Sequence, residues 1–190
     1  MVYSSTDITC IVLAGGNSSR MGFDKGFFVV DGVSMVERVI NIGRCVTDNI
    51  IISSNNNEYK KVGFKVIPDV EKGLGPIGGL ESVLNEIETK FAFTIPVDTP
   101  FVDPEIFSIL FPRVLTENLV AVKYQNNIHP LFMMFNVSYI KEKMPLYIQT
   151  KNLKMRDFIN NLGSFVDIDT CGKNSIDSKS FLNINSQKDL

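Results

Sequence analysis

The chain lacks a surplus of charge of either sign, which limits what it can bind over a large surface. Its 190 residues carry 19 Lys and Arg against 21 Asp and Glu, a formal net charge of -2. Proteins that bind nucleic acid mainly through charge need a broad basic field, so nucleic acid is not an expected partner. Any anion site must therefore be local, built from a few cations and backbone amides.

Cysteines and long hydrophobic runs are also scarce. The three cysteines, Cys10, Cys45 and Cys171, show no CxxC spacing, which argues against a disulfide framework or a zinc knuckle and is typical of a reducing compartment. The first apolar run, 8–13, is short and follows no basic segment, so no secretory signal is expected. No stretch approaches the roughly 18 apolar residues that a membrane helix needs. We therefore expect a cytoplasmic protein that does not associate with membranes.

Apolar runs and amphipathic stretches alternate along the chain, which indicates an α/β fold with a largely parallel sheet. The length suits one domain, expected to span 1–190. Apolar runs predict strands at 8–13, 49–52, 64–67, 91–97, 119–124 and 131–136, with short strands near Phe165 and Phe181. Helical spacing predicts helices over 34–46, 80–87, 138–144 and 154–161, and Pro104 suits the first turn of another helix that ends near Leu110.

The stretch LAGGNSSRMGFDKG, residues 13–26, directly follows the first predicted strand. In open α/β sheets, ligands bind beyond the carboxyl ends of the strands. Gly15 and Gly16 lack a Cβ and can adopt positive φ, so their amides can form a concavity that binds anions. Arg20 adds a forked donor and Lys25 a point charge, both suited to phosphate oxygens. The alternative is an ordinary strand-to-helix turn with solvated basic side chains.

Two familiar phosphate-binding motifs do not fit this stretch. A dinucleotide-binding fold needs GxGxxG, which the glycines at 15, 16 and 22 do not supply. A P-loop needs GxxxxGK followed by Ser or Thr, whereas Gly22 is followed by Phe23, Asp24 and Lys25. The residues alone therefore predict an anion site and leave its ligand open.

Residue by residue, the stretch resembles the first motif of the molybdenum cofactor guanylyltransferases, LAGGxSxRMGxDK. Later segments resemble further motifs of that nucleotidyltransferase family in the same order. They are 68–69 with 73–79 (PD…GPLxG, with Ile77 in place of Leu), 98–101 (DxP), 129–131 (HP) and 183–190 (NxNTxxDL, with Ser186 in place of Thr). The resemblance implies a Rossmann-like nucleotidyltransferase fold, with three layers, α/β/α, around a mostly parallel central sheet.

The resemblance implies transfer of GMP from GTP to the terminal phosphate of molybdenum-molybdopterin, with release of pyrophosphate and Mg²⁺ as cofactor. GTP and molybdopterin would be the substrates, and cofactor-synthesis proteins or molybdoenzymes would be transient partners. The nearest alternative is a sister enzyme that makes the cytidylyl form of the cofactor or activates a sugar phosphate. Another is a non-catalytic nucleotide-binding protein, although the presence of both Lys25 and Asp98 counts against it.

The resemblance assigns catalysis to Lys25, Arg20 and Asp98. Asp98 ends an apolar strand, where a carboxylate can hold a hard cation, and it would be the Mg²⁺ ligand. Read alone, an aspartate before Thr-Pro fits the cap of the following turn equally well. Lys25 would neutralise the triphosphate and the departing pyrophosphate, and its alternative is a solvated lysine near a helix start.

Nucleotide binding would also use the first predicted strand end and a later aspartate. The residues that the resemblance implies are Leu13, Ala14, Gly15, Gly16, Lys25, Asp69 and Asp98. Asp69 would contact the nucleoside, although after Pro68 it reads alone as a turn residue. The family often has Asn directly after the second strand, where this chain has Ser53. Either Asn55 takes that contact from two residues on, or the contact is weakened.

The acceptor substrate would lie near the C-terminal motif. Asn183 and Asn185 alternate by two, so on an extended segment they face the same way, and their amides suit a polar heterocycle such as a pterin. The resemblance implies that they bind molybdopterin, and a polar turn is the alternative. Lys154 and Arg156 fit either the phosphate of the pterin or a solvated helix face. His129, the only histidine, lies beside a proline and is not predicted to be catalytic.

Overall fold

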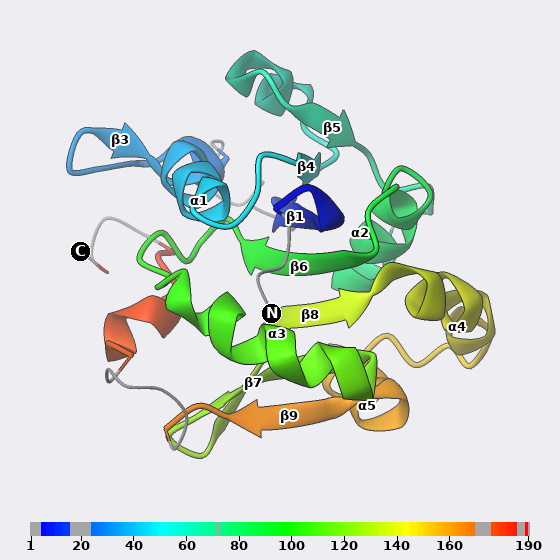
Figure 1. Ribbon diagram of the computed structural model, residues 1–190. Helices are drawn as coiled ribbons and strands as arrows, with labels where there is room; N and C mark the ends of the chain where they lie inside the picture. The colour runs from blue at the N-terminus through cyan, green and yellow to red at the C-terminus, as the bar shows by residue number, and fades with distance from the viewer. Residues whose placement is uncertain (1–4, 16–23, 72, 170–175, 186–188, 190) are drawn as a thin grey trace.

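The computed structural model describes residues 5–15, 24–71, 73–169, 176–185 and 189, and these contain a seven-stranded sheet (Figure 1). The strand order is β5-β4-β1-β6-β8-β7-β9, and only β8 runs antiparallel to its neighbours. The strands are β1 (Ile8–Leu13), β4 (Ile50–Ser53), β5 (Lys65–Ile67), β6 (Phe91–Pro96), β7 (Leu119–Tyr124), β8 (Asn127–Asn136) and β9 (Ser164–Asp167). A small hairpin of β2 (Val29–Val30) and β3 (Val33–Ser34) lies outside this sheet.

Helices follow most of the strands. They are α1 (Met35–Arg44), α2 (Gly75–Leu84), α3 (Glu105–Glu117), α4 (Val137–Gln149) and α5 (Met155–Leu162), with the short 3₁₀ turns η1 (Ser5–Asp7), η3 (Lys25–Phe27), η4 (Asn57–Val62) and η5 (Ser178–Phe181). The start of α1 is fixed by a capping box in which Ser34 and Glu37 bond each other's backbone amides. In the described part of the chain, no helix has the length and apolar character that a bilayer crossing requires.

The strands direct alternate side chains into two apolar layers, because successive Cβ atoms point to opposite faces of a sheet. On β1, Cys10 and Val12 pack in a buried cluster with α1 and α3. Ile11 and Leu13 pack in a second cluster with α2, α4 and α5. The predicted three-layer α/β/α fold with a mostly parallel sheet is therefore confirmed (Figure 1).

The structure corrects several predicted elements. The helix expected over 80–87 is α2, which begins at Gly75 and ends at Leu84. The strand expected near Phe181 is wrong, because this residue ends η5 and its ring packs 4.8 Å from Tyr124 and 4.2 Å from His129. The helix expected to end near Leu110 continues through Pro112 to Glu117. Burial of Phe111 and Val114 offsets the free-energy cost of the backbone hydrogen bond that proline cannot donate. The strand expected from 131 begins four residues earlier, at Asn127.

Three parallel neighbours, β1, β4 and β6, end at the same edge of the sheet. Their register places Leu13 beside Ser53 on one side and beside Pro96 on the other. The segments that leave these strands carry Gly15, Asn55 and Asp98. This edge therefore brings together residues that lie far apart in the sequence.

Candidate active site

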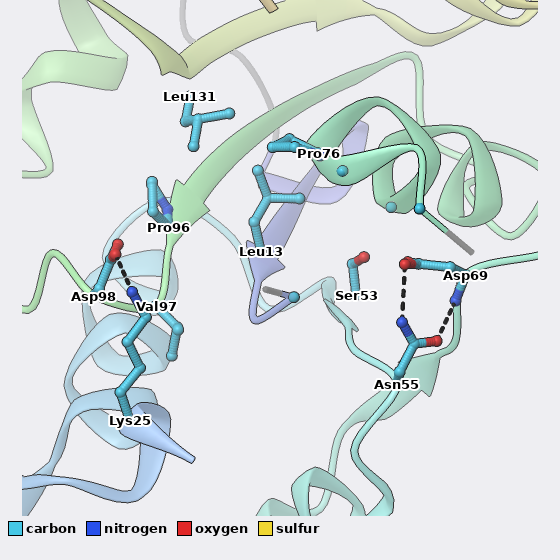
Figure 2. Close-up of a pocket in the computed structure, with 14 residues that line it drawn as sticks. Leu13, Lys25, Ser53, Asn55, Asp69, Pro76, Pro96, Val97, Asp98 and Leu131 are labelled. Carbon is cyan, nitrogen blue, oxygen red and sulfur yellow. Dashed lines mark hydrogen bonds and ion pairs between the residues drawn. The ribbon is translucent and has the colours of Figure 1, made fainter. Parts of the chain in front are cut away.

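A cavity of about 550 Å³ opens at the carboxyl ends of β1, β4 and β6 (Figure 2). The first turn of α2, from Gly75, forms another part of its wall. The lining residues are Leu13, Gly15, Lys25, Ser53, Asn55, Asp69, Gly73, Gly75, Pro76, Gly79, Pro96, Val97, Asp98 and Leu131. Figure 2 shows Lys25 with Asp98 on one side and Asn55 with Asp69 on the other, with Leu13 and Ser53 between them.

On the first side, an ammonium group lies between two side-chain oxygens. Lys25 Nζ donates to Asp98 Oδ2 at 2.5 Å and to Asn185 Oδ1 at 3.3 Å. The C-terminal segment is held there by its backbone, because the N–H of Ile184 donates to the carbonyl oxygen of Asp98 at 2.8 Å. The side chains of Lys25 and Asp98 are 27% and 17% exposed, so both are accessible from the cavity.

The same oxygens fit a hard cation whose remaining ligands come from a substrate. Asp98 Oδ2 and Asn185 Oδ1 already hold one cation, the lysine ammonium. Across the described ranges, no group of three or more His, Cys, Asp and Glu side chains could hold a metal by itself. Magnesium at nucleotide sites typically takes one or two carboxylates and completes its shell with water and substrate phosphates. The donor set therefore fits a metal that arrives with a polyphosphate.

On the other side, Asn55 and Asp69 form a reciprocal pair. Asn55 Nδ2 donates to Asp69 Oδ2 at 2.8 Å, and the N–H of Asp69 donates to Asn55 Oδ1 at 3.0 Å. Ser53 is only 1% exposed and forms the floor, where a Cβ on Gly79 would lie 2.6 Å from its Oγ. Asn55, which the sequence offered as the residue that takes the contact expected at Ser53, therefore lies beside Asp69 at the cavity wall.

The two glycine-rich segments differ in backbone conformation. Gly15 lies outside the left-handed region, whereas Gly73 and Gly75, in the second glycine-rich segment, have φ of 91° and 59°. Both backbone groups of Ala14 are bonded within the protein, because its N–H donates to Ser53 O and its carbonyl accepts from Ser54 Oγ. We therefore expect the backbone of Gly15, and not that of Ala14, to form hydrogen bonds with a ligand.

Comparison with known proteins identifies the family. Residues 10–164 match the model of the MobA-like NTP transferase domain. The chain belongs to this family. It is therefore a nucleotidyltransferase, and the expected class of enzyme is confirmed.

Individual proteins similar to this MobA-like NTP transferase support the family assignment. A molybdenum cofactor guanylyltransferase of Haemophilus influenzae (strain 86-028NP) is 32% identical over 165 residues, which cover 82% of this chain and 84% of that protein. The fold is similar to molybdopterin-guanine dinucleotide biosynthesis protein A of Archaeoglobus fulgidus, with a TM-score of 0.74, 20% identity and coverage of 95% and 94%. It is also similar to a manganese complex of Rv0371C from Mycobacterium tuberculosis, with a TM-score of 0.63, 13% identity and coverage of 96% and 95%.

The structure places half of the site residues that the sequence predicted for this MobA-like transferase at the cavity, and Ala14 is absent from its lining. Leu13, Gly15, Lys25, Asp69 and Asp98 all line the cavity. Gly16 and Arg20 lie outside the described residues, so their roles stay predictions.

The residues predicted for the acceptor substrate are separated. Asn183 and Asn185 are both exposed, flank the buried Ile184 and are absent from the cavity lining, but Asn185 contacts a lining residue, Lys25. Lys154 and Arg156 are exposed at the start of α5 and also lie outside the cavity lining. Asn185 is thus the member of this group that the structure places at the site.

Sequence reasoning missed several residues of the cavity wall. Pro96 and Val97 line it from the end of β6, and no motif marks them. Pro76, Gly79 and Leu131 lie inside segments that the resemblance had already marked, GPIGG and HPL. The signal for these three was present as a motif, although their place on the wall needed the fold.

The titration of His129, which does not line the cavity, tests the packing around it and can be followed alone because it is the only histidine. Its ring packs 4.2 Å from Phe181 and 6.2 Å from Phe132, and burial lowers the pKa of His129 below the ordinary 6.5. We expect its single Hε1 NMR signal to titrate with a midpoint below 6.5. Because the folded pKa is depressed, stability from this residue is present above about pH 6.5 and falls as pH is lowered. A midpoint above 6.5 contradicts the prediction.

Proposed function

We propose that this protein transfers GMP from GTP to the terminal phosphate of molybdenum-bound molybdopterin and releases pyrophosphate. The observation that carries the proposal is the division of the cavity between two kinds of group. Lys25 and Asp98 form a charged pair on one side, and Asn55 and Asp69 form a hydrogen-bonded pair on the other. This division suits a nucleotide whose triphosphate and base lie at opposite ends.

The carboxylate of Asp69 supports guanine as the base. An ionised carboxylate only accepts hydrogen bonds, and Asn55 already fills one side of Oδ2. Guanine presents two neighbouring donors on its pairing edge, N1–H and the N2 amino group. Cytosine presents one amino group beside an acceptor nitrogen, which a carboxylate repels. The relative from Haemophilus influenzae, named a guanylyltransferase, agrees with this choice.

The chemistry needs positioning and charge neutralisation more than a base. The terminal phosphate of molybdopterin is already anionic when it attacks the α-phosphorus in line, so no strong general base is required. Lys25 would stabilise the charge that develops on the departing pyrophosphate. Mg²⁺, held by Asp98 and by phosphate oxygens of the nucleotide, would neutralise further charge. Its use is supported by the donor set and by the manganese complex of the related fold.

The substrates and location belong to the same proposal. Asn185, next to Lys25, would lie where the acceptor phosphate meets the nucleotide.

Both described cysteines are free, with Cys10 buried and Cys45 exposed, which supports a reducing, cytoplasmic location. Burial raises the pKa of the Cys10 thiol, so it stays protonated within the core.

The test is incubation of the protein with molybdenum-bound molybdopterin, Mg²⁺ and either α-labelled GTP or α-labelled CTP. We expect label to pass from GTP to the pterin with release of pyrophosphate. Transfer from CTP alone would replace the proposal with the sister cytidylyltransferase. Nucleotide binding without pyrophosphate release from any nucleoside triphosphate would indicate a non-catalytic protein.

A further inference from the structure

Asp24, the residue before Lys25, has a carboxylate that accepts three hydrogen bonds. Its Oδ1 accepts from Tyr59 Oη at 2.6 Å and from the N–H of Gly26 at 3.0 Å. Its Oδ2 accepts from Asn56 Nδ2 at 3.0 Å. Asp24 also caps η3, the 3₁₀ turn that begins with Lys25. The carboxylate therefore ties the turn that presents Lys25 to the segment of η4.

Tyr59 is a fully buried hydroxyl that contributes nothing to the cavity wall. Its side chain is 0% exposed, and its ring lies 4.8 Å from that of Phe27 in the same turn as Lys25. Burial, together with the neighbouring carboxylate of Asp24, raises the pKa of Tyr59, so the hydroxyl stays neutral and donates. A buried hydroxyl is stabilising only when it is hydrogen-bonded, and Asp24 supplies the acceptor.

Gly26 is required for this contact. A Cβ on Gly26 would lie 2.0 Å from Tyr59 Oη, well inside van der Waals contact. The sequence Asp24-Lys25-Gly26 therefore places an acceptor before Lys25 and a gap for the tyrosine hydroxyl after it. The packing on both sides of Lys25 is set by the same residue, Tyr59.

The segment that carries Tyr59 is itself anchored to the sheet. Asn56 Oδ1 accepts from the N–H of Glu58 at 2.9 Å, while the N–H of Asn56 donates to Ser54 Oγ at 3.1 Å. Ser54 Oγ in turn donates to the carbonyl oxygen of Ala14 at the end of β1. Tyr59 and Asn56 thus hold Asp24 from a support that is fixed to β1 and β4.

We propose that Tyr59 and Asp24 are positioning residues for Lys25. The hydrogen bond between them fixes the turn η3, so the ammonium group of Lys25 is directed at Asp98 and at an incoming polyphosphate. Neither residue needs to touch the nucleotide, since both act through Lys25. The effect on the reaction rests on the proposed function, whereas the effect on Lys25 itself does not.

Substitution Tyr59→Phe tests the inference because it keeps the ring and removes only the donor. We expect kcat for nucleotidyl transfer to fall about 10- to 100-fold, with a small change in KM, since displacement of a catalytic group by about 1 Å can cost up to 10²-fold. Tyr139→Phe is the matched control, because Tyr139 Oη donates to Leu162 O at 3.2 Å away from the cavity lining. It should lose comparable stability and retain kcat.

A double-mutant cycle separates positioning from a general loss of stability. If Tyr59 acts through Lys25, Tyr59→Phe should lower kcat no further in a Lys25→Ala background. Equal fold-reductions in both backgrounds, or an unchanged kcat for Tyr59→Phe in the wild-type background, would overturn the inference.

A second readout does not depend on transfer activity. The nucleotide-free protein is treated with acetic anhydride, and acylation of Lys25 is compared by mass spectrometry with that of Lys141, whose Nζ donates to Ile87 O at 2.9 Å. We expect Tyr59→Phe to raise the relative acylation of Lys25 severalfold and Tyr139→Phe to leave it unchanged. Equal acylation in wild type and Tyr59→Phe overturns the inference.

The two readouts keep the inference distinct from the proposed function. If Lys25 acylation rises but no nucleotide is transferred by the wild-type protein, the positioning stands and the proposed function fails. If Tyr59→Phe does not fold, Asn56→Ala removes another donor to the same carboxylate from a half-buried position and serves for both measurements. It should raise acylation of Lys25 in the same direction, and unchanged acylation contradicts the inference.

Discussion

Replacing Asp98 with alanine is expected to leave the protein folded and to lower kcat for nucleotidyl transfer by about 10²–10³-fold, the usual cost of removing one preorganised electrostatic group. The fold should survive because the carboxylate bonds Lys25 at the cavity and its side chain is partly exposed. The C-terminal segment should also stay in place, because Ile184 bonds the backbone carbonyl of Asp98 and not its side chain. Circular dichroism and transfer assays on the purified variant check both parts.

A matched control distinguishes the loss of a carboxylate from the loss of an ion pair. Glu86 Oε2 also lies 2.5 Å from a lysine, Lys65 Nζ, and neither of these two residues lines the cavity. Glu86→Ala should retain wild-type kcat, since exposed ion pairs contribute little to stability. Wild-type turnover in a folded Asp98→Ala protein would remove Asp98 from the metal site and from catalysis.

The sheet was the most predictable part of this fold, and the reason is visible in two strands. β1 and β7 begin and end where the apolar runs 8–13 and 119–124 do, because β1 is buried throughout and β7 is buried over its first four residues and followed by a turn. The antiparallel direction of β8 could not be read from periodicity, since a buried strand shows the same pattern in either direction. The extension of α3 through Pro112 depended on tertiary packing of Phe111, which also has no local signal.

Some residues of the site could likewise be predicted from local motifs, whereas the contacts between distant residues could not. Lys25, Asp69 and Asp98 were predictable because each lies in a short motif that the family resemblance marks. The contact between Lys25 and Asn185 joins residues 160 positions apart, so only the fold could place these two side chains together. The hydrogen bond from Tyr59 to Asp24 spans 35 positions and leaves no periodic trace in the sequence.

Lys25→Ala is expected to lower kcat by about 10²–10³-fold, as Asp98→Ala does, since both groups would stabilise charge that develops on the phosphates. The two substitutions should nevertheless act in opposite directions on metal binding by the nucleotide-free protein. In the wild type, the ammonium of Lys25 lies 2.5 Å from Asp98 Oδ2 and occupies an oxygen that a cation would use. Removing this positive charge leaves the carboxylate free and removes electrostatic repulsion of an incoming cation.

Electron paramagnetic resonance of Mn²⁺ measures this difference directly, because free and bound ions give distinct signals. We expect the order of Mn²⁺ affinity to be Lys25→Ala, then wild type, then Asp98→Ala, while both variants stay folded and nearly inactive. Equal affinity in wild type and Lys25→Ala would show that the lysine and the metal do not compete for Asp98. The ion pair would then mark a site for phosphate alone, and the metal would have to be held by other groups. If Lys25→Ala raises Mn²⁺ affinity and Asp98→Ala lowers it, Lys25 competes with the metal for Asp98. If only Asp98→Ala changes the affinity, Lys25 acts on phosphate alone.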